Sequence, residues 1–306
     1  MREALSYRAY AAVWGLVRRL PERAAYRLFQ LVADAVWRSR RGAVAGLERN
    51  LRRVRPDADD AELRALSREG MRSYLRYWCD AFRLADWSLD RTVSTVRCEH
   101  EERLRGPLAE GRGVIAALAH MGNWDHAGAW AARTGAPVVT VAERLRPERL
   151  YERFLAYRAD LGIEILPLTG GGTDLVRTLT DHLREGRLVP LLADRDLRAS
   201  GIDVTFFGEA TKMPPGPALL ALQSGAALHP VSIRYERRGR GAAGFGIVID
   251  FLDEVPVPVS GTTRERVESV TAAVAGALES AVAASPEDWH MVSPLWLVDL
   301  GERVPR

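Results

Sequence analysis

One short stretch, Val114 to Trp130, limits the folds open to this chain more than any other part of the sequence. Its first five residues, VIAAL, form an apolar run with the length of a buried strand. The chain then reaches His120, and Asn123 supplies a favourable N-cap for a helix. Because side chains on such strand-to-helix turns face the ligand crevice of an α/β sheet, His120 is predicted to lie at a functional site.

Apolar, β-rich runs alternate with helical patterns from residue 112 to residue 235. The later runs cover residues 137–142, 163–166, 188–193 and 227–235. Such alternation is typical of parallel strands joined by helices. The predicted fold class is α/β, with a central mixed, mostly parallel β-sheet flanked by helices on both faces. A further strand over 245–251 is expected to run antiparallel at an edge of the sheet.

The first hundred residues show helical patterns and stand apart from this alternation. A chain of 306 residues that is 47% hydrophobic can bury a large core. We therefore expect a helical N-terminal part over residues 1–100, followed by an α/β core over residues 101–306 as one continuous domain.

His120 and Asp125 are candidates for general acid–base chemistry. Asp125 falls in the first turn of the predicted helix, from where its carboxylate can reach back to the imidazole. A carboxylate on one ring nitrogen fixes the tautomer and leaves the other nitrogen free to accept a proton. His120 would then be a general base for a hydroxyl group. The alternative is an ordinary contact at a helix start, which the same spacing allows.

Two sequence blocks carry a resemblance to a known family. The segment AHMGNWD, residues 119–125, has a His-x-x-x-x-Asp signature directly after a strand and resembles the lysophospholipid acyltransferase superfamily. With ADRDLRASGIDVTFFGEATKMPPGPALLA, residues 193–221, it resembles the bacterial lipid A acyltransferase branch, and within it the actinobacterial phosphatidylinositol mannoside acyltransferases. The resemblance covers nearly the whole chain.

The resemblance implies a third acidic residue at the site. Asp194, at the carboxyl end of another predicted strand, would face His120 and stabilise its imidazolium form. The implied catalytic residues are therefore His120, Asp125 and Asp194. A structural alternative for this block is an ion pair between Arg195 and Asp196.

Polar residues around these three are assigned to substrate binding. Glu143 could bind a sugar hydroxyl, and Arg158 could hold a phosphate by a bidentate contact. A solvated strand end and an arginine-rich surface helix are the respective alternatives. Oxyanion donors would come from backbone N–H groups near Gly122 and Asn123, or from Arg195. The expected substrate-binding residues are Glu143, Arg158, Arg195, Asp196, Asn123 and Gly122. The resemblance implies an acyl groove lined by Trp124, Phe207 and Met213, and of these Phe207 and Met213 could instead be plain core.

The resemblance implies transfer of a long-chain acyl group from palmitoyl-CoA or a similar donor to a hydroxyl, on mannose, of a phosphatidylinositol mannoside. Another lysophospholipid or lipid A-like glycolipid is an alternative acceptor, and an acyl-CoA thioesterase or esterase is an alternative activity. No metal and no cofactor beyond the acyl-CoA co-substrate are expected. The two cysteines, Cys79 and Cys98, form no metal or redox motif.

The N-terminal helices have the features of an interfacial membrane anchor. Residues 1–56 contain thirteen arginines and four acidic residues, and the helices expected over 4–20 and 21–39 are amphipathic and aromatic. The alternative is that their apolar faces only pack on the core. We expect a peripheral protein on the cytoplasmic face of the plasma membrane, bound to an anionic surface. A nucleic-acid partner is not expected, because no recognition motif accompanies the arginines.

Overall fold

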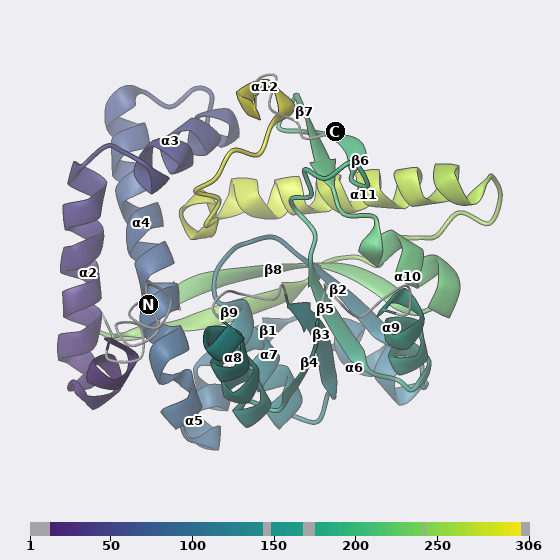
Figure 1. Cartoon of the computed structure of the whole chain (residues 1–306), viewed down its shortest axis with the longest axis horizontal. Coiled ribbons are helices and arrows are strands. Elements are labelled where there is room, and N and C mark those ends of the chain that lie inside the picture. The colour runs from purple at the N-terminus through teal and green to yellow at the C-terminus, as the bar shows by residue number, and fades with distance from the viewer. Residues whose placement is uncertain (1–12, 143–147, 168–174, 242, 301–306) are drawn as a thin grey trace.

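The computed structural model describes residues 13–142, 148–167, 175–241 and 243–300, and its centre is a seven-stranded sheet (Figure 1). The strand order across the sheet is β1 (Val96–Glu99), β9 (Phe245–Phe251), β8 (Ala227–Arg237), β2 (Val114–Leu118), β5 (Leu188–Leu192), β3 (Val138–Ala142) and β4 (Ile163–Pro167). A separate hairpin joins β6 (Ile202–Phe206) to β7 (Glu209–Met213).

The directions of the strands confirm a mixed, mostly parallel sheet. Strands β8, β2, β5, β3 and β4 are parallel neighbours, whereas β9 runs antiparallel to β8. The expectation that β9 lies at an edge is wrong, because β1 pairs with its outer side in parallel register. β1 has only four residues, two of them charged, so the apolar pattern used for the other strands does not reveal it.

Helices cover both faces of the sheet, as the sequence predicts. The side chains of β2 alternate between two buried clusters, with Ile115 and Ala117 in one and Val114 and Ala116 in the other. This two-sided burial explains why the strand reads as a continuous apolar run. The helices of the first face are α9 (Leu175–Arg184), α10 (Gly216–Ser224) and α11 (Thr263–Ala284), and those of the second are α6 (Glu102–Ala109), α7 (Trp124–Arg133) and α8 (Glu148–Asp160).

One helix of the described residues, α11, is long and apolar enough to cross a membrane by length and composition. It begins at a capping box formed by Thr262 and Glu265. Its apolar residues, among them Val270 and Leu278, are buried against the sheet and the hairpin. Helix α11 is therefore a core helix of this fold.

Three helices of the N-terminal part stand beside the sheet: α2 (Glu22–Arg38), α3 (Ala43–Val54) and α4 (Asp60–Arg83) (Figure 1). A capping box of Asp59 and Glu62 starts α4. At the other end of α4, Phe82 packs with Trp14 in the same buried cluster as the second face of the sheet. The proposed division of the chain at residue 100 stays a prediction.

The remaining helical elements are short. They are η1 (Leu84–Asp86), α5 (Leu89–Ser94), η3 (Pro286–Asp288) and α12 (Leu297–Leu300). The sequence predicts an extended segment over residues 91–101; β1 lies within this segment, but α5 covers its start.

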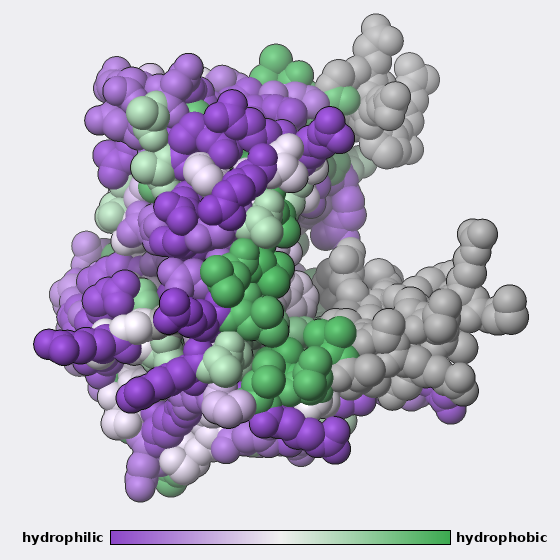
Figure 2. Space-filling model, turned by 90° about the vertical axis from the view of Figure 1, so that its left-hand side faces the viewer, coloured by the Kyte–Doolittle hydropathy of each residue, from purple (hydrophilic) through white to green (hydrophobic). Residues whose placement is uncertain are grey.

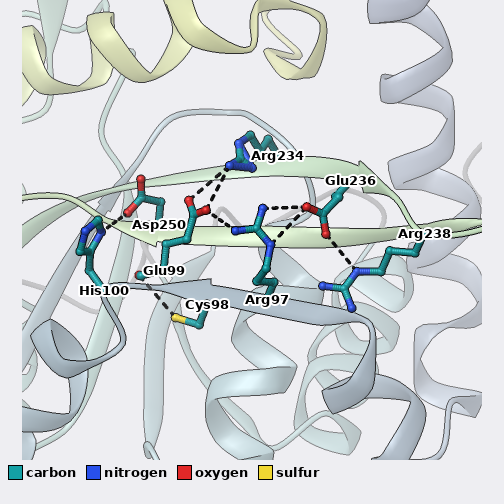
Figure 3. Close-up of polar contacts among 8 residues, drawn as sticks. All are labelled: Arg97, Cys98, Glu99, His100, Arg234, Glu236, Arg238 and Asp250. Carbon is teal, nitrogen blue, oxygen red and sulfur yellow. Dashed lines mark hydrogen bonds and ion pairs between the residues drawn. The ribbon is translucent and has the colours of Figure 1, made fainter.

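A charged ladder lies across β1, β9 and β8 (Figure 3). Arg97 of β1 pairs with Glu236 of β8, and Glu99 of β1 pairs with Arg234 of β8. Between these strands, Val248 of β9 is buried. Such exposed ion pairs contribute about 0–1 kcal/mol each, so the ladder keeps this strip polar and adds little to stability. At its end, His100 Nδ1 lies 2.8 Å from Asp250 Oδ1.

Candidate active site

The turn between β2 and α7 requires a glycine at position 122. Gly122 has a φ of +59°, and a Cβ atom there would lie 2.3 Å from the carbonyl oxygen of Ile233. Asn123 then caps α7, because its Oδ1 accepts the backbone N–H of His126 at 2.9 Å. The turn therefore follows from two residues of the sequence, one for its backbone conformation and one for the helix start.

Replacing Gly122 by alanine should unfold this turn. The left-handed backbone costs of order 1–3 kcal/mol and the clash is with backbone, so we expect about 3 kcal/mol or more of lost stability. Gly276→Ala is the matched control, because Gly276 is helical, exposed and has no atom within 4 Å of an added Cβ. Thermal unfolding of both variants measures the difference. Equal melting temperatures would contradict this account of the turn.

Residues 288–290 of the C-terminal segment hold the turn through two backbone hydrogen bonds. The Gly122 N–H donates to the carbonyl of Asp288 at 2.8 Å, and the His290 N–H donates to the carbonyl of His120 at 2.7 Å. Between these two bonds, Met121 and Trp289 form an antiparallel bridge. The position of His120 is therefore fixed by residues about 170 positions away in the chain.

Asp194 is the carboxylate that contacts the His120 ring. Its Oδ1 lies 2.6 Å from His120 Nδ1, and its Oδ2 accepts the His120 backbone N–H at 2.9 Å. The indole Nε1 of Trp289 also donates to Oδ2, at 3.0 Å. Asp194 is fully buried, whereas the His120 side chain is 34% exposed. The arrangement is a buried carboxylate behind an imidazole that solvent or a substrate can reach.

The contact between His120 and Asp194 shifts both pKa values, in opposite directions. Burial lowers the pKa of His120, but the charge and hydrogen bond of Asp194 more than offset it, so the pKa of His120 is raised. Burial raises the pKa of Asp194, but its contacts with His120 and Trp289 outweigh burial, so the pKa of Asp194 is lowered. Because ionised Asp194 can only accept hydrogen bonds, Nδ1 of His120 carries the hydrogen and Nε2 is the basic nitrogen.

Asp125 does not contact the ring, which corrects the expectation drawn from its spacing. The described residues show no hydrogen bond between Asp125 and His120. Asp125 is buried, and its Oδ1 accepts from Arg158 Nε at 3.0 Å while its Oδ2 accepts from Tyr77 at 3.1 Å. At the start of α7 the carboxylate turns toward α4 and α8.

Arg158 therefore lies beside the turn, as part of an ion pair with Asp125. The charge of Asp125 raises the pKa of Arg158, so the guanidinium is held in its charged form. Its side chain is 19% exposed. The alternative is an arginine-rich surface helix, whereas this side chain is mostly buried in an ion pair; its contact with a phosphate stays a prediction.

Arg195 and Asp196, the charged residues that follow Asp194, make different contacts. Asp196 is buried and pairs with Arg198, at 2.7 Å to Nε and 2.9 Å to Nη2, so the alternative of an ion pair between Arg195 and Asp196 is wrong. These contacts fix the loop after β5 and occupy the carboxylate that we expected to bind substrate. Arg195 is exposed, donates from Nε to the carbonyl of Pro294 at 3.1 Å, and lowers the pKa of His120 by its charge.

The backbone N–H of Gly122 and the side chain of Asn123 are engaged within the protein, so neither group is open to a substrate, and an oxyanion contact from the Asn123 N–H stays a prediction. The Gly122 N–H already donates to Asp288, and Asn123 is completely buried. Asn123 Nδ2 donates to Asp80 Oδ2 at 3.0 Å, and Tyr235 donates to the same oxygen at 2.8 Å. Burial raises the pKa of Asp80 in spite of these bonds. These groups hold the turn in place.

The three residues assigned to the acyl groove have different surroundings. Trp124 is half-buried, with its ring 4.3 Å from that of Tyr77 and 5.9 Å from that of His120. Phe207 is half-buried on the β6–β7 turn, where its ring lies 6.4 Å from that of Trp289. Met213 is fully buried in the main core cluster, so its expected place on a groove wall is corrected to core.

Glu143 lies outside the described residues. Several residues of the site were missed as participants by sequence reasoning, because only the fold brings them there. They are Ser73, Tyr77 and Asp80 of α4, and Asp288, Trp289 and His290 of the C-terminal segment. Within the described ranges, no group of three His, Cys, Asp or Glu residues could hold a metal ion.

A buried strand-to-helix turn that presents a histidine paired with a carboxylate is suited to activating a hydroxyl nucleophile. The model of the bacterial lipid A biosynthesis acyltransferase family matches residues 2–298. The chain therefore belongs to this acyltransferase family, and the resemblance seen in its sequence blocks is confirmed.

Two named relatives of this chain are both phosphatidylinositol mannoside acyltransferases. The phosphatidylinositol mannoside acyltransferase of Mycolicibacterium smegmatis is 42% identical over 295 residues, which cover 96% of this chain and 92% of the relative. The phosphatidylinositol mannoside acyltransferase of Mycobacterium tuberculosis is 40% identical over 301 residues, which cover 96% and 89% of the two chains.

Proposed function

We propose that this acyltransferase moves a long-chain acyl group from acyl-CoA to a mannose hydroxyl of a phosphatidylinositol mannoside, with His120 as the general base. The observation that carries the proposal is the 2.6 Å contact between His120 Nδ1 and buried Asp194, which leaves Nε2 as the basic nitrogen. The acceptor class is supported by the names of the two mycobacterial relatives.

The reaction then needs few groups. His120 Nε2 removes the proton of the acceptor hydroxyl as the oxygen attacks the thioester carbonyl carbon. The carbon–sulfur bond of the tetrahedral intermediate breaks, and the CoA thiolate takes the proton back from the imidazolium. Asp194 stabilises the imidazolium between these two transfers. No covalent acyl-enzyme is required.

Arg158 is proposed to contact the phosphate of the acceptor. Asp125 fixes the guanidinium beside the turn through its Nε atom, at 3.0 Å. A guanidinium held in one orientation loses less conformational entropy when it binds a phosphate. The assignment of Glu143 to a sugar hydroxyl also stays a proposal.

Product analysis tests the acceptor class. The purified protein is incubated with palmitoyl-CoA and a mannosylated phosphatidylinositol, and the lipids are analysed by mass spectrometry. We expect an added palmitoyl group on the mannose. A lysophospholipid and a lipid A-like glycolipid are tested in parallel, and faster acylation of either would replace the proposed acceptor. Free palmitate as the main product would indicate a thioesterase instead.

An apolar surface on the N-terminal helices supports the membrane association that the family suggests. Helix α2 buries Ala25, Tyr26 and Ala33 against α4 and the core, yet exposes a second apolar face. Figure 2 shows a hydrophobic area on this side of the molecule. The exposed apolar residues are Leu28, Leu31, Val32 and Val36 of α2, together with Val13 and Leu16 of the helical stretch at residues 13–19 that precedes it. We propose that this surface docks on the cytoplasmic leaflet of the plasma membrane.

The double change Leu28→Asp and Leu31→Asp should remove membrane binding. Burial of one leucine side chain is worth about 1.5–3 kcal/mol, so two losses should weaken binding about hundredfold or more. Flotation with anionic liposomes measures the effect. The control is Val259→Asp with Val298→Asp, which charges two exposed apolar residues outside this surface. Equal flotation of both double variants would exclude the surface as the docking face.

A further inference from the structure

The buried carboxylate of Asp80 joins helix α2 to the turn between β2 and α7. Asp80 lies near the end of α4 and is 3% exposed. Its Oδ1 accepts from the hydroxyl of Tyr26 on α2. Its Oδ2 accepts from Asn123 Nδ2 at 3.0 Å and from the hydroxyl of Tyr235 on β8 at 2.8 Å. One side chain therefore holds the helix of the proposed docking face by one oxygen and the turn that carries His120 by the other.

Two planar groups in series can transmit a shift of Tyr26 to this turn. The Asp80 carboxylate rotates as one unit, so its two oxygens move together. The amide of Asn123 is also planar, with Nδ2 on Asp80 and Oδ1 accepting the backbone N–H of His126 at 2.9 Å. When Tyr26 moves away from Oδ1, the carboxylate can turn, and the contact that places Asn123 is lost with it. The start of α7 and the preceding turn then lose one of their fixed points.

Burial makes these hydrogen bonds costly to lose. Burial raises the pKa of Asp80, against the opposing effect of the hydrogen bonds from Tyr26, Tyr235 and Asn123. Burial, and after it the charge of Asp80, raises the pKa of Tyr26 well above its ordinary value, so the Tyr26 hydroxyl keeps its hydrogen and remains a donor. A buried polar group that loses its partner costs about 1–3 kcal/mol. Loss of the Tyr26 contact is therefore large enough to make Asp80 reorient.

Few fully buried apolar side chains hold α2 on the rest of the protein. Four of its 17 residues are buried, and two of these are alanines, Ala25 and Ala33. An element with so few buried apolar groups opens locally at a low free energy. The other two, Tyr26 and Asp34, are polar and would lie unsatisfied in hydrocarbon. A bilayer that takes up the opposite, apolar face of α2 (Figure 2) therefore favours the position in which Tyr26 stays on Asp80.

We propose that Tyr26 and Asp80 are positioning residues of the transferase, and that docking of α2 on an anionic lipid surface raises kcat by fixing the turn through Asn123. The proposal rests on the proposed function, because it requires His120 as the base and α2 on the membrane. A ligand shifts a conformational equilibrium only by its preference for one state, and here the lipid surface prefers the state with α2 packed. The bilayer is then an effector of the active site as well as the source of the acceptor.

Tyr26→Phe removes one hydroxyl and leaves the apolar face of α2 intact. A small misplacement of a catalytic group can cost about 10²-fold, so we expect kcat to fall about tenfold to hundredfold with the acceptor in anionic liposomes. KM for the acceptor and flotation with the liposomes should not change, because the docking face is the same. The rate of CoA release over a range of acceptor concentrations measures both constants.

Ser67→Ala is the matched control. It removes the acceptor of the Trp37 indole, at 3.0 Å, and so breaks another hydrogen bond between α2 and α4. Ser67 lies about 20 Å along α4 from Asp80, away from the turn. We expect its kcat to stay within about twofold of the wild type. Melting temperatures show whether the two variants are equally destabilised. Equal losses of kcat in the two variants, or no loss in Tyr26→Phe, would overturn the proposal.

Amide hydrogen exchange measures the effect of lipid on the turn without any turnover. The reporter is the His126 N–H, which donates to Asn123. The probe is a vesicle of phosphatidylglycerol and phosphatidylcholine that contains no acceptor. We expect these vesicles to slow exchange of the His126 N–H in the wild type and in Ser67→Ala, but not in Tyr26→Phe.

Flotation with the same vesicles separates the outcomes. Unchanged exchange in wild-type protein that floats would overturn the proposal and leave the docking face in place. Protein that does not float would reject the docking face and this proposal together. Slower exchange in a protein that transfers no acyl group would support the link from α2 to the turn and reject only the proposed reaction.

Discussion

Replacing His120 by alanine should reduce acyl transfer by about 10²–10⁴-fold, the range that a positioned general base contributes. The alanine removes Nε2, the nitrogen that Asp194 keeps basic through its contact with Nδ1. The backbone groups that hold the turn remain, since they are the carbonyl of His120 and the N–H groups of its neighbours. The rate of CoA release in the presence of acceptor lipid measures the effect.

His100→Ala is the matched control for this variant. His100 is a half-exposed histidine that pairs with Asp250 at the edge of the sheet, away from the turn (Figure 3). Its loss should leave the rate within about twofold, because exposed pairs contribute little. A His120→Ala protein that unfolds at the wild-type temperature and still transfers acyl groups at the wild-type rate would rule out His120 as the base.

The second large effect is expected for Asp194→Asn, of the order of 10³-fold in kcat. Two donors, the His120 N–H and the Trp289 indole, point at Oδ2 of Asp194. The amide oxygen of an asparagine would stay with these donors and place its NH₂ group against Nδ1 of His120. The ring would then hold its hydrogen on Nε2, the wrong tautomer for a base.

The pH profile gives this variant a second signature. Asp194 raises the pKa of His120 against the opposing effect of burial, so wild-type activity should rise with pH through a region above 6.5. Without the carboxylate, burial dominates, and this rise should move to lower pH. Asp196→Asn is the control, because Asp196 holds a loop through Arg198 and does not contact the ring. An unshifted profile in Asp194→Asn would show that Asp194 does not set the basicity of His120.

The strands that surround the site could be predicted because they are buried on both faces. Val114–Leu118 and Leu188–Leu192 are apolar throughout, and a continuous apolar run is the pattern of a parallel strand within an α/β sheet. β1 was not predictable in this way, since four residues with exposed charges carry no such pattern. Its place beside β9 depends on pairing between segments about 150 residues apart.

Spacing along the chain does not predict which carboxylate, Asp125 or Asp194, contacts the His120 ring. β2 and β5 are adjacent, and Leu118 lies opposite Leu192. His120 and Asp194 each follow two residues later, so the register brings them together. Asp125 is closer in sequence, but the start of α7 directs it to Arg158 and Tyr77. A local motif predicts that both residues belong to the site, and only the register of the sheet decides which one contacts the ring.

The C-terminal contribution was still harder to foresee. Trp289 and His290 occur in an aromatic segment, residues 286–297, that the sequence predicts to be a structural cap. His290 resembles a position of the family near the end of the chain, but from the sequence we assign it to structure. Their place follows from the bridge to Met121 and from contacts with α4. Such residues can be found from sequence only when the long-range pairing is known.

The most direct test of the central claim is CoA release from palmitoyl-CoA by the wild type and by His120→Ala, each with and without a mannosylated phosphatidylinositol. The account predicts release that requires both His120 and the acceptor lipid. Release that proceeds equally without the acceptor, or that survives the loss of His120, would contradict it.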